Sequence, residues 1–418
     1  MHLAYLFLII FSAIVYLLWL YNICISLKGF GTVRGPKPAT SLRRFAVIVP
    51  AHNEEQVIQD LLHSIYRQSY PSTHFDIFVS ADNCTDRTAE LSSRVGATVF
   101  ERRDDADGGK AGNIRFALAQ IELSAYDAVV LFDADNLVHK YFLTSMNNFL
   151  EAEPTAAAVQ GYLDVKNPRD NWITVAYTMT YLFTNRFWQL ARSRLGLSAL
   201  LGGTGAVIRA AALLKHGWKT QSLTEDIEFT VKLILEGKRV FWNHEAVVYD
   251  EKPVSYTAAL RQRQRWIQGQ FWTLIRYLRP LVVALVRGDM GPGRFQCIDI
   301  MIYLMVPGQM LITYAAMLFF GVSSVAGALL LGLTVESVVF GLATLSLLAY
   351  LFVMQAIVAP SLYHGRVSLG YIRYFFHVLA SIAFVLPAHL LGAANWHNQR
   401  TWVKTQHTRS IRIEERSR

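Results

Sequence analysis

Charged and aromatic side chains gather in three short segments of this 418-residue sequence, in patterns suited to chemistry. The segment "DAD" carries Asp133 and Asp135, "TED" carries Glu225 and Asp226 as neighbours, and "QRQRW" (262–266) combines arginines with a tryptophan. Two carboxylates at positions i and i+2 repel each other unless a cation lies between them, and Mg²⁺ and Mn²⁺ accept such oxygen ligands. Asp133 and Asp135 therefore predict a divalent-metal site, with solvated surface acids as the alternative.

Two further segments suit a phosphorylated ligand, although each also has an ordinary structural interpretation. In "DGGKAGN" (107–113), backbone amides and the ammonium of Lys110 precede a helical stretch, which is an arrangement that binds phosphate. In "ADNCTD", Asp82 and Asp86 follow an apolar run. Both aspartates would also suit a turn and a helix cap. Similarly, "QRQRW" alone would suit the basic start of an interfacial helix.

Three apolar runs must position these side chains, and each ends in polar residues. They lie within Arg44–Glu55, Phe75–Asp86 and Tyr126–Asn136, and helical stretches separate them. Strands that alternate with helices predict an α/β fold with a mainly parallel sheet. In such sheets ligands bind beyond the carboxyl ends of the strands, where the acidic clusters fall.

Both ends of the chain are apolar, which accounts for a mean hydropathy of +0.26 that is too high for an ordinary soluble protein. Leu3–Leu27 is uncharged and long enough to cross a bilayer. A cleaved signal peptide is the alternative, but no basic start or cleavage site is clear. Basic residues from Lys28 to Arg44 follow this segment and place the next domain in the cytoplasm of the cell.

The net charge of +9 does not form one long basic tract, so nucleic acid is not an expected partner, whereas membrane lipids are. The three cysteines are far apart and lack metal-ligand spacing. Apolar runs near Ile298–Phe320, Val338–Ala359 and Tyr371–Gly392 predict three further spans. Three spans would leave the basic tail outside, so either Pro387 breaks the last one into a returning hairpin or Val322–Val335 also crosses.

The predicted organisation has five parts in chain order. These are an N-terminal transmembrane helix (1–28), a cytoplasmic catalytic domain (40–270), interfacial amphipathic helices (271–295), a C-terminal transmembrane region (296–395) and a basic tail (396–418). The interfacial assignment follows from mixed aromatic, aliphatic and arginine residues in Phe271–Gly288. A helix packed on the soluble domain remains the alternative there.

The order "PAHNEE", "ADNCTD", "GGKAGN", "DADN", "GGTGAV", "TED" and "QRQRW" resembles the membrane-embedded family 2 glycosyltransferases. Within this family, the sequence is similar to the cellulose, hyaluronan and chitooligosaccharide synthases. The resemblance covers Arg44–Gly269 and implies an α/β, Rossmann-like GT-A domain between transmembrane helices. It also implies inverting transfer of a sugar from a UDP-sugar with Mg²⁺ or Mn²⁺ as cofactor.

The resemblance further implies roles for individual residues. Those expected to bind the nucleotide are Ala51, His52, Glu54, Asp82, Lys110 and Asp133. The position of His52 is usually aromatic in the synthases, so the stacking of the base stays open. Asp135, with Asp133, would ligate the metal on the diphosphate.

In this resemblance Asp226 is the general base, with Glu225 beside it, because an inverting transfer needs one carboxylate to take the acceptor proton. In "QRQRW", Gln262 and Arg265 would contact the leaving diphosphate, since guanidinium binds phosphate in a fork, and Trp266 would offer a face to the acceptor sugar. The tail residues Trp402 and Thr405 are similar to a gating segment that closes over the nucleotide. A plain basic juxtamembrane tail is the alternative.

The predicted function is therefore a membrane β-glycosyltransferase that extends a polysaccharide and is coupled to its export. One alternative is a transferase that adds a single sugar to a polyprenyl-phosphate lipid or lipid-linked oligosaccharide. A second, from another class, is a nonenzymatic membrane receptor or transporter with an inactive transferase domain, against which the intact "DAD", "TED" and "QRQRW" argue. The sugar, the linkage and the oligomeric state stay open.

Overall fold

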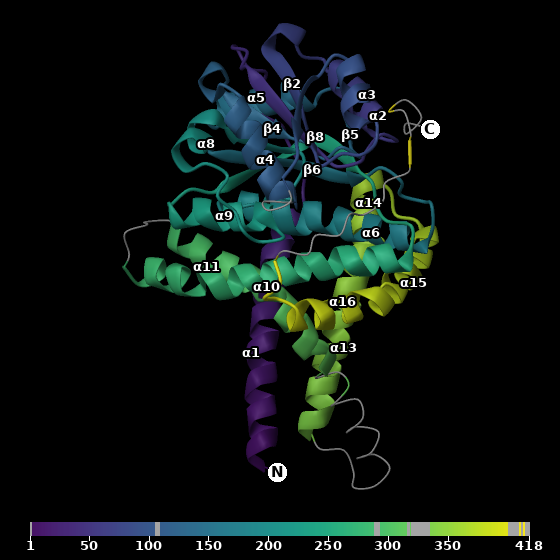
Figure 1. Ribbon diagram of the computed structural model, residues 1–418. Helices are drawn as coiled ribbons and strands as arrows, with labels where there is room; N and C mark the ends of the chain where they lie inside the picture. The colour runs from purple at the N-terminus through teal and green to yellow at the C-terminus, as the bar shows by residue number, and fades with distance from the viewer. Residues whose placement is uncertain are drawn as a thin grey trace.

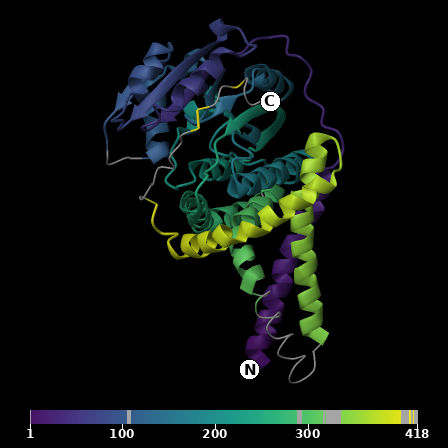
Figure 2. The same ribbon diagram turned by 90° about the vertical axis from the view of Figure 1, so that its right-hand side faces the viewer.

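The computed structural model describes residues 2–104, 109–287, 293–315, 318, 335–399, 409–410 and 413. An α/β domain lies above a layer of helices, and two long helices extend from that layer on the side away from the sheet (Figures 1 and 2). The chain therefore has three levels, and the middle level connects the sheet with the long helices.

One mixed sheet forms the centre of the α/β domain, with the order β3-β2-β1-β4-β7-β6-β8-β5. The strands are β1 (Phe45–Ala51), β2 (Phe75–Asp82), β3 (Thr98–Arg102), β4 (Ala128–Leu131), β5 (Leu137–Val138), β6 (Ala158–Val165), β7 (Ala206–Arg209) and β8 (Val240–Asp250). The predicted parallel pairing is confirmed for β3, β2, β1 and β4. Strand β7 is antiparallel to both of its neighbours, β4 and β6, which makes the sheet mixed.

Apolar residues cover both faces of this sheet because its central strands are buried on both sides. On one face pack α2 (Ile58–Tyr66), α3 (Thr88–Arg94) and α5 (Phe142–Ala152). On the other face pack α4 (Gly109–Gln120), α8 (Ala210–His216) and α9 (Glu225–Leu235). The parallel strands β1, β2 and β4 thus end together at one edge, where the polar segments follow.

The middle layer consists of helices that lie beneath the sheet domain. They are α6 (Trp172–Phe183), the π-helix η4 (Thr184–Leu190), α7 (Ala191–Arg194), α10 (Tyr256–Arg287), α15 (Ile372–Ala380) and α16 (Ile382–Ala394). Helices α10 and α16 pack side by side (Figure 1). The predicted boundary at residue 270 falls inside α10, so "QRQRW" and the expected interfacial segment form one continuous helix.

The long helices are α1 (His2–Ser26) and α13 (Val335–Val353), and α13 continues through the π-helix η5 (Met354–Val358) and α14 (Ala359–His364). Trp19 of α1 packs with Leu347 of α13. Before them in the layer, α11 (Gly293–Leu304) is followed by the helix Val306–Ala315 at an angle of 45°. By length and composition, the helices Leu345–His364 and Ile372–Ala394 suit a membrane span in the described ranges, and the bent pair would make a third if it is one span. Ala13–Gly29, mostly in α1, is a shorter apolar helix.

The third predicted C-terminal span, Tyr371–Gly392, has a different place. Its helices α15 and α16 are together long and apolar enough to cross a bilayer, yet α16 packs along α10, α15 packs against α6, and both lie across the direction of α1 and α13 (Figures 1 and 2). Pro387 is inside α16 and does not break it into a hairpin, which corrects that expectation. The predicted segment Val322–Val335 lies almost wholly outside the described residues. With α15 and α16 in the middle layer, the tail needs no hairpin to stay beside the α/β domain.

A buried ion pair holds α1, the middle layer and α11 together. The Nε atom of Arg192 lies 2.9 Å from a carboxylate oxygen of Asp299 in α11, and its Nη2 donates to Asn22 of α1 at 3.0 Å. Tyr21 also donates to Asp299, at 3.1 Å. Arg192 and Asp299 are 1% and 4% exposed, so these charges are paired away from water.

Candidate active site

One cavity of about 2400 Å³ extends from the strand ends of the α/β domain to the middle layer and the upper ends of the long helices. All sequence-predicted site residues within the described ranges line it. They are Ala51, His52, Glu54, Asp82, Lys110, Asp133, Asp135, Glu225, Asp226, Gln262, Arg265 and Trp266. The remaining two, Trp402 and Thr405, lie outside the described residues, so their gating role stays a prediction.

The chain turns sharply where β1 and β2 end. Asn53 and Asn83 have φ angles of 55° and 49°, in the left-handed region that asparagine tolerates better than most residues. These turns bring the two loops together, and the Nδ1 of His52 donates to the carbonyl oxygen of Asp82 at 2.7 Å. Arg102 of β3 approaches the Asp82 carboxylate at 3.5 Å. The sheet thus fixes the part of the cavity in which a nucleoside was predicted.

Lys110, at the start of α4, lies among three carboxylates. One is Asp133, and the other two are the neighbours Glu225 and Asp226. The ammonium of Lys110 forms an ion pair with Asp133, lies 3.7 Å from Glu225 and donates to the carbonyl oxygen of Gly203 at 2.8 Å. Burial alone would lower the pKa of Lys110, but Asp133, Glu225 and Asp226 outweigh this effect and raise it. Lys110 is therefore a fixed cation between the predicted nucleotide and base positions.

The loop that contains "GGTG" closes the site on one side. A Cβ atom at Gly203 would lie 3.3 Å from the Oδ2 of Asp226 and 3.3 Å from the Nζ of Lys110, and its φ of 77° disfavours other residues. The motif therefore permits a close approach of backbone to two charged groups. Sequence reasoning placed "GGTGAV" in the family order but assigned no physical role to this glycine.

Asp226 is the acid whose environment changes its titration most clearly. Its pKa is raised to about 7, chiefly by burial and then by the nearby Glu225 carboxylate, while Lys110 acts in the opposite direction. A carboxylate with a pKa near neutrality suits general-base catalysis, because it is a stronger base than an ordinary aspartate and is still ionised at the working pH. The geometry of this site therefore permits the predicted role of Asp226.

The "DAD" carboxylates differ in exposure although both line the cavity. The Asp133 side chain is 32% exposed, whereas Asp135 is 3% exposed and accepts from Asn136 at 3.2 Å. Within the described ranges, no three His, Cys, Asp or Glu side chains form a complete metal cage. Mg²⁺ commonly uses one or two carboxylates together with substrate phosphates and water, so these two oxygen donors fit a metal shared with a diphosphate.

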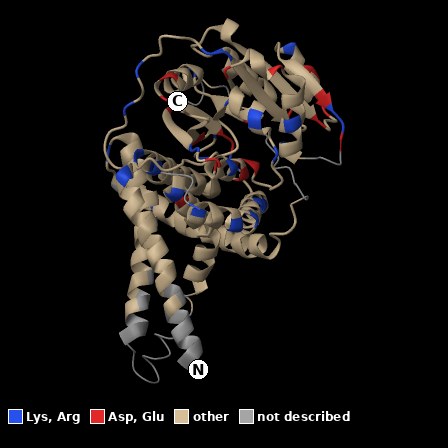
Figure 3. Cartoon of the chain, turned by 90° about the vertical axis from the view of Figure 1, so that its left-hand side faces the viewer, with Lys and Arg blue, Asp and Glu red and all other residues tan. Residues whose placement is uncertain are grey.

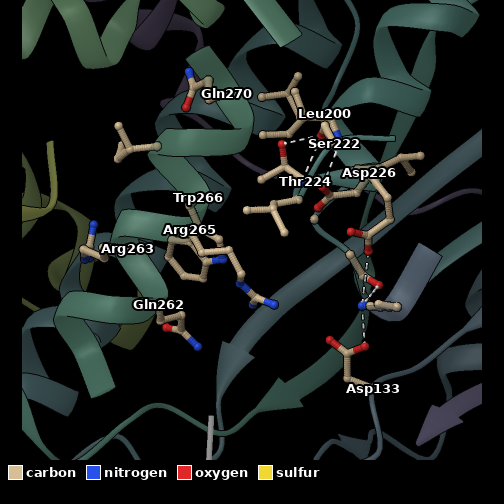
Figure 4. Close-up of a pocket in the computed structure, with 18 of the residues that line it drawn as sticks. Asp133, Leu200, Ser222, Thr224, Asp226, Gln262, Arg263, Arg265, Trp266 and Gln270 are labelled. Atoms are coloured by element: carbon tan, nitrogen blue, oxygen red, sulfur yellow. Dashed lines mark hydrogen bonds and ion pairs between the residues drawn. The ribbon is translucent and has the colours of Figure 1, made fainter. Parts of the chain in front are cut away.

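Helix α10 supplies the opposite wall of the cavity. Figure 4 shows Arg265 directed toward the side on which Asp133 and Asp226 lie, with Trp266 next to it, whereas Arg263 points to the other side of the helix. Arg263 packs over the ring of Tyr177, 4.6 Å from its centroid. The alternating directions explain why a basic stretch contributes both to the cavity and to packing within the middle layer.

A second charged cluster adjoins the cavity at the end of β8. Asp250 and Glu251 line the cavity, Lys252 forms an ion pair with Asp250, and Lys166 donates to the carbonyl oxygen of Asp135 at 3.0 Å. Lys252 also donates to Tyr181 at 2.6 Å. The predicted site residues did not include Asp250, Glu251, Lys252 or Lys166. The available signal was a pair of acids, Asp250 and Glu251, at the end of an apolar strand. The same signal identified "DAD".

Strand ends that carry paired acids, a fixed lysine and a cationic helix define an α/β nucleotide-sugar transferase of the GT-A type. The family described as glycosyltransferase like family 2 matches residues 43–269, more than half of the chain. The chain belongs to glycosyltransferase family 2, which confirms the predicted family and the GT-A fold.

Several relatives are similar over this domain. The probable glycosyltransferase YdaM of Bacillus subtilis is 27% identical over 244 residues, which are 57% of this chain and 57% of that protein. The beta-monoglucosyldiacylglycerol synthase of Nostoc sp. is 30% identical over 247 residues, 57% of this chain and 51% of that protein. The poly-beta-1,6-N-acetyl-D-glucosamine synthase of Staphylococcus aureus is 25% identical over 239 residues, 56% of each chain. The chain spans about half the length of these relatives.

A solved structure is similar over almost the whole chain. The mannosyltransferase PcManGT from Pyrobaculum calidifontis, in complex with GDP-Man and Mn²⁺, superposes with a TM-score of 0.58 and 21% sequence identity. The match covers 91% of this chain and 98% of that one. This likeness establishes a shared fold that includes segments beyond the family 2 domain.

Proposed function

We propose that this protein is an inverting, metal-dependent glycosyltransferase that moves a sugar from a UDP-sugar to an acceptor hydroxyl. Asp226 takes the hydroxyl proton while the acceptor oxygen bonds to the anomeric carbon and the bond from that carbon to the diphosphate breaks. Glu225 lies beside the base and helps to raise its pKa. The observation that carries the proposal is the single cavity shared by the predicted nucleotide, metal, base and acceptor residues.

Cations on opposite sides of the cavity suit the departing nucleoside diphosphate. Lys110 approaches from the sheet and Arg265 from α10, and fixed positive charge stabilises the negative charge that develops on the leaving group. Asp133 and Asp135 would hold Mg²⁺ or Mn²⁺, which supplies further neutralisation of the diphosphate when bound. The mannosyltransferase with GDP-Man and Mn²⁺ supports a nucleotide-sugar donor and a divalent metal for this fold.

We propose a growing glycan chain as the acceptor. The cavity volume of about 2400 Å³ exceeds the roughly 300–1,000 Å³ of an ordinary small-molecule pocket, so a donor and several acceptor sugars fit together. Aromatic rings that suit sugar faces line the cavity, including Trp188, Trp266 and Trp272. The relative that is a poly-beta-1,6-N-acetyl-D-glucosamine synthase supports this choice.

A lipid-linked acceptor is the second candidate, and a specific feature favours it. The far end of the cavity is lined by Trp19 of α1, Met310 and Leu351, which belong to apolar helices. A hydroxyl attached to a lipid would reach Asp226 from that direction. The relative that is a beta-monoglucosyldiacylglycerol synthase supports this alternative.

We further propose that the chain is integral to the cell membrane, with the α/β domain in the cytoplasm. Lys and Arg residues gather where the α/β domain meets the helices beneath it (Figure 3), as the positive-inside rule expects for a cytoplasmic face. A membrane-impermeant thiol reagent tests this, because Cys84 belongs to the α/β domain. Labelling of Cys84 in intact cells, with Cys84→Ser as the control, would contradict this orientation.

The decisive assay uses the purified protein in lipid nanodiscs with labelled UDP-glucose, UDP-N-acetylglucosamine, a UDP-uronic acid and GDP-mannose. A ladder of products on a gel supports glycan extension. A single product that partitions into organic solvent supports the lipid acceptor instead. No incorporation from any donor, with Asp226→Asn as the background control, would refute the proposed activity.

A further inference from the structure

The loop that leads into "TED" has its backbone held almost entirely by side chains. Four consecutive N–H groups, those of residues 221–224, donate to side-chain oxygens. Gln221 and Ser222 donate to Glu228 at 2.6 and 2.8 Å, Leu223 donates to Gln399 at 2.7 Å, and Thr224 donates to Ser222 Oγ at 3.0 Å. No strand or helix fixes the course of residues 219–224, here called the pre-base loop. Three of these four N–H groups therefore depend on Glu228 and Gln399, while Arg115 and Lys232 donate to the loop carbonyl oxygens of Thr220 and Lys219.

Both of these side chains are in turn bonded to α10. The second carboxylate oxygen of Glu228 accepts from the hydroxyl of Tyr277 at 2.8 Å. Gln399 donates to the carbonyl oxygen of Gln268 at 3.4 Å, and the Gln268 side chain donates to Asn398. Tyr277 and Gln268 belong to the helix that also carries Arg265 and Trp266.

Direct packing brings the same helix against the pre-base loop. A Cβ atom at Gly269 would lie 2.5 Å from the Oγ1 of Thr224 and 2.8 Å from its backbone nitrogen. The helix backbone and the loop are therefore in contact with no room for a side chain between them. Because Thr224 immediately precedes Glu225 and Asp226, any displacement of the loop would displace the predicted base.

We propose that Glu228 and Gln399 are positioning residues that fix the pre-base loop to α10 and so set the distance between Asp226 and the groups on that helix. Glu228 is 1% exposed and is not itself a cavity-lining residue, so it acts through the loop residues Gln221 and Ser222, which line the cavity. Gln399 follows α16 and brings the C-terminal part of the chain into the same arrangement. The inference rests on the proposed function, in which Asp226 and Arg265 act on one reacting centre.

The physical consequence is that loop placement and nucleotide binding are separable. The predicted nucleoside residues His52, Glu54 and Asp82 lie where β1 and β2 end, and none of them bonds to the pre-base loop in the described part of the chain. Loss of a positioning bond should therefore reduce turnover while nucleotide affinity stays the same. Misplacement of a reacting group by about 1 Å can cost up to about 100-fold in rate.

The test combines hydrogen exchange with kinetics on the full-length protein in lipid nanodiscs. In Gln399→Ala, the peptide that covers residues 219–224 should exchange about tenfold faster, because Leu223 loses its acceptor and the local opening becomes easier. Transfer kcat should fall about 10-fold, with UDP affinity within about 2-fold of the wild type. Asn395→Ala is the matched control, since Asn395 lies just upstream and its side chain donates to the Leu391 carbonyl oxygen of α16.

A second variant keeps the test informative if Gln399→Ala folds poorly. Tyr277→Phe removes only the hydroxyl that joins Glu228 to α10 and leaves Glu228 to hold the loop, so exchange and kcat should change in the same direction but less. Unchanged exchange in both variants would overturn the proposal, whatever the activity. Faster exchange with unchanged kcat would overturn the positioning role. Faster exchange in a protein that transfers no sugar would support the loop contacts and refute the proposed function.

Discussion

The two sides of the cavity are built by different means. On the donor side, His52, Asp82 and Asp133 follow strands of one sheet, and backbone pairing fixes their spacing. On the acceptor side, Asp226 and Trp266 lie on separate helices, and side-chain bonds between distant parts of the sequence hold these helices together. The donor side should therefore keep its shape without the membrane, whereas the acceptor side depends on helices that lie against it.

This contrast has a functional consequence for an enzyme with two substrates. A rigid strand-end site suits a soluble donor of constant shape. A site assembled from helices can adjust to an acceptor that arrives from the membrane side of the cavity. If this division holds, each substitution on one side should change the binding or turnover that depends on that side and spare the other side.

The largest effect is expected at the metal position of the donor side. Asp135→Ala should abolish measurable transfer and also weaken UDP binding in Mg²⁺ or Mn²⁺, because the diphosphate loses its shared cation. Wild-type protein treated with EDTA should behave alike, as measured by UDP titration and labelled-sugar transfer. Glu90→Ala is the control, because the Glu90 side chain of α3 is exposed. Full activity in EDTA would show that the "DAD" assignment is wrong.

The next effect separates the two sides. Asp226→Asn keeps the shape of the side chain but removes the proton acceptor, so transfer should fall about 100-fold or more while UDP affinity is retained. Isothermal titration and turnover on the same preparation measure both quantities. Glu236→Gln is the matched control, because Glu236 directly follows α9 and does not line the cavity. Near-normal turnover would assign the base elsewhere, with Glu225 as the next candidate.

A pH profile should show the same division with a smaller effect. The pKa of Asp226 is raised to about 7, chiefly by burial, so the carboxylate becomes protonated and inactive as the pH falls below that value. Transfer kcat should therefore be level above about pH 8 and fall about 30-fold by about pH 5.5. UDP affinity should change less over this range. A flat profile would contradict Asp226 as the titrating base.

The smallest effect is expected at the aromatic wall of the acceptor side. Trp266→Ala should raise the KM for the acceptor about tenfold and leave the KM for the donor unchanged, because it removes a face against which sugar rings pack. Trp266→Phe keeps an aromatic ring and should recover most of the loss. A rise in the donor KM alone would place Trp266 on the wrong side of the cavity.

The strand-end side of the cavity could be predicted from the sequence more fully than the helical side. The strands that lead to His52, Asp82 and Asp133 are recognisable as apolar runs that end in polar residues, so the parallel strands and the place of these residues at strand ends could be predicted from local pattern. The roles of Glu228 and Gln399 could not be predicted in this way. Glu228 is one of several acids within a helix, and Gln399 lies 176 residues from its partner Leu223. Likewise, composition made Tyr371–Gly392 a membrane span, and only its packing along α10 places it in the middle layer.

The buried pair of Arg192 and Asp299 also constrains how the protein is made. The two residues are 107 positions apart, so a ribosome completes the α/β domain before it supplies the carboxylate that neutralises the arginine. Until α11 arrives, the guanidinium must stay hydrated, and the middle layer cannot close over it. A nascent chain that stopped before Gly293 would carry an uncompensated buried cation, which costs about 3–5 kcal/mol. Folding of the α/β domain and packing of the C-terminal helices against it should therefore be completed in a single step.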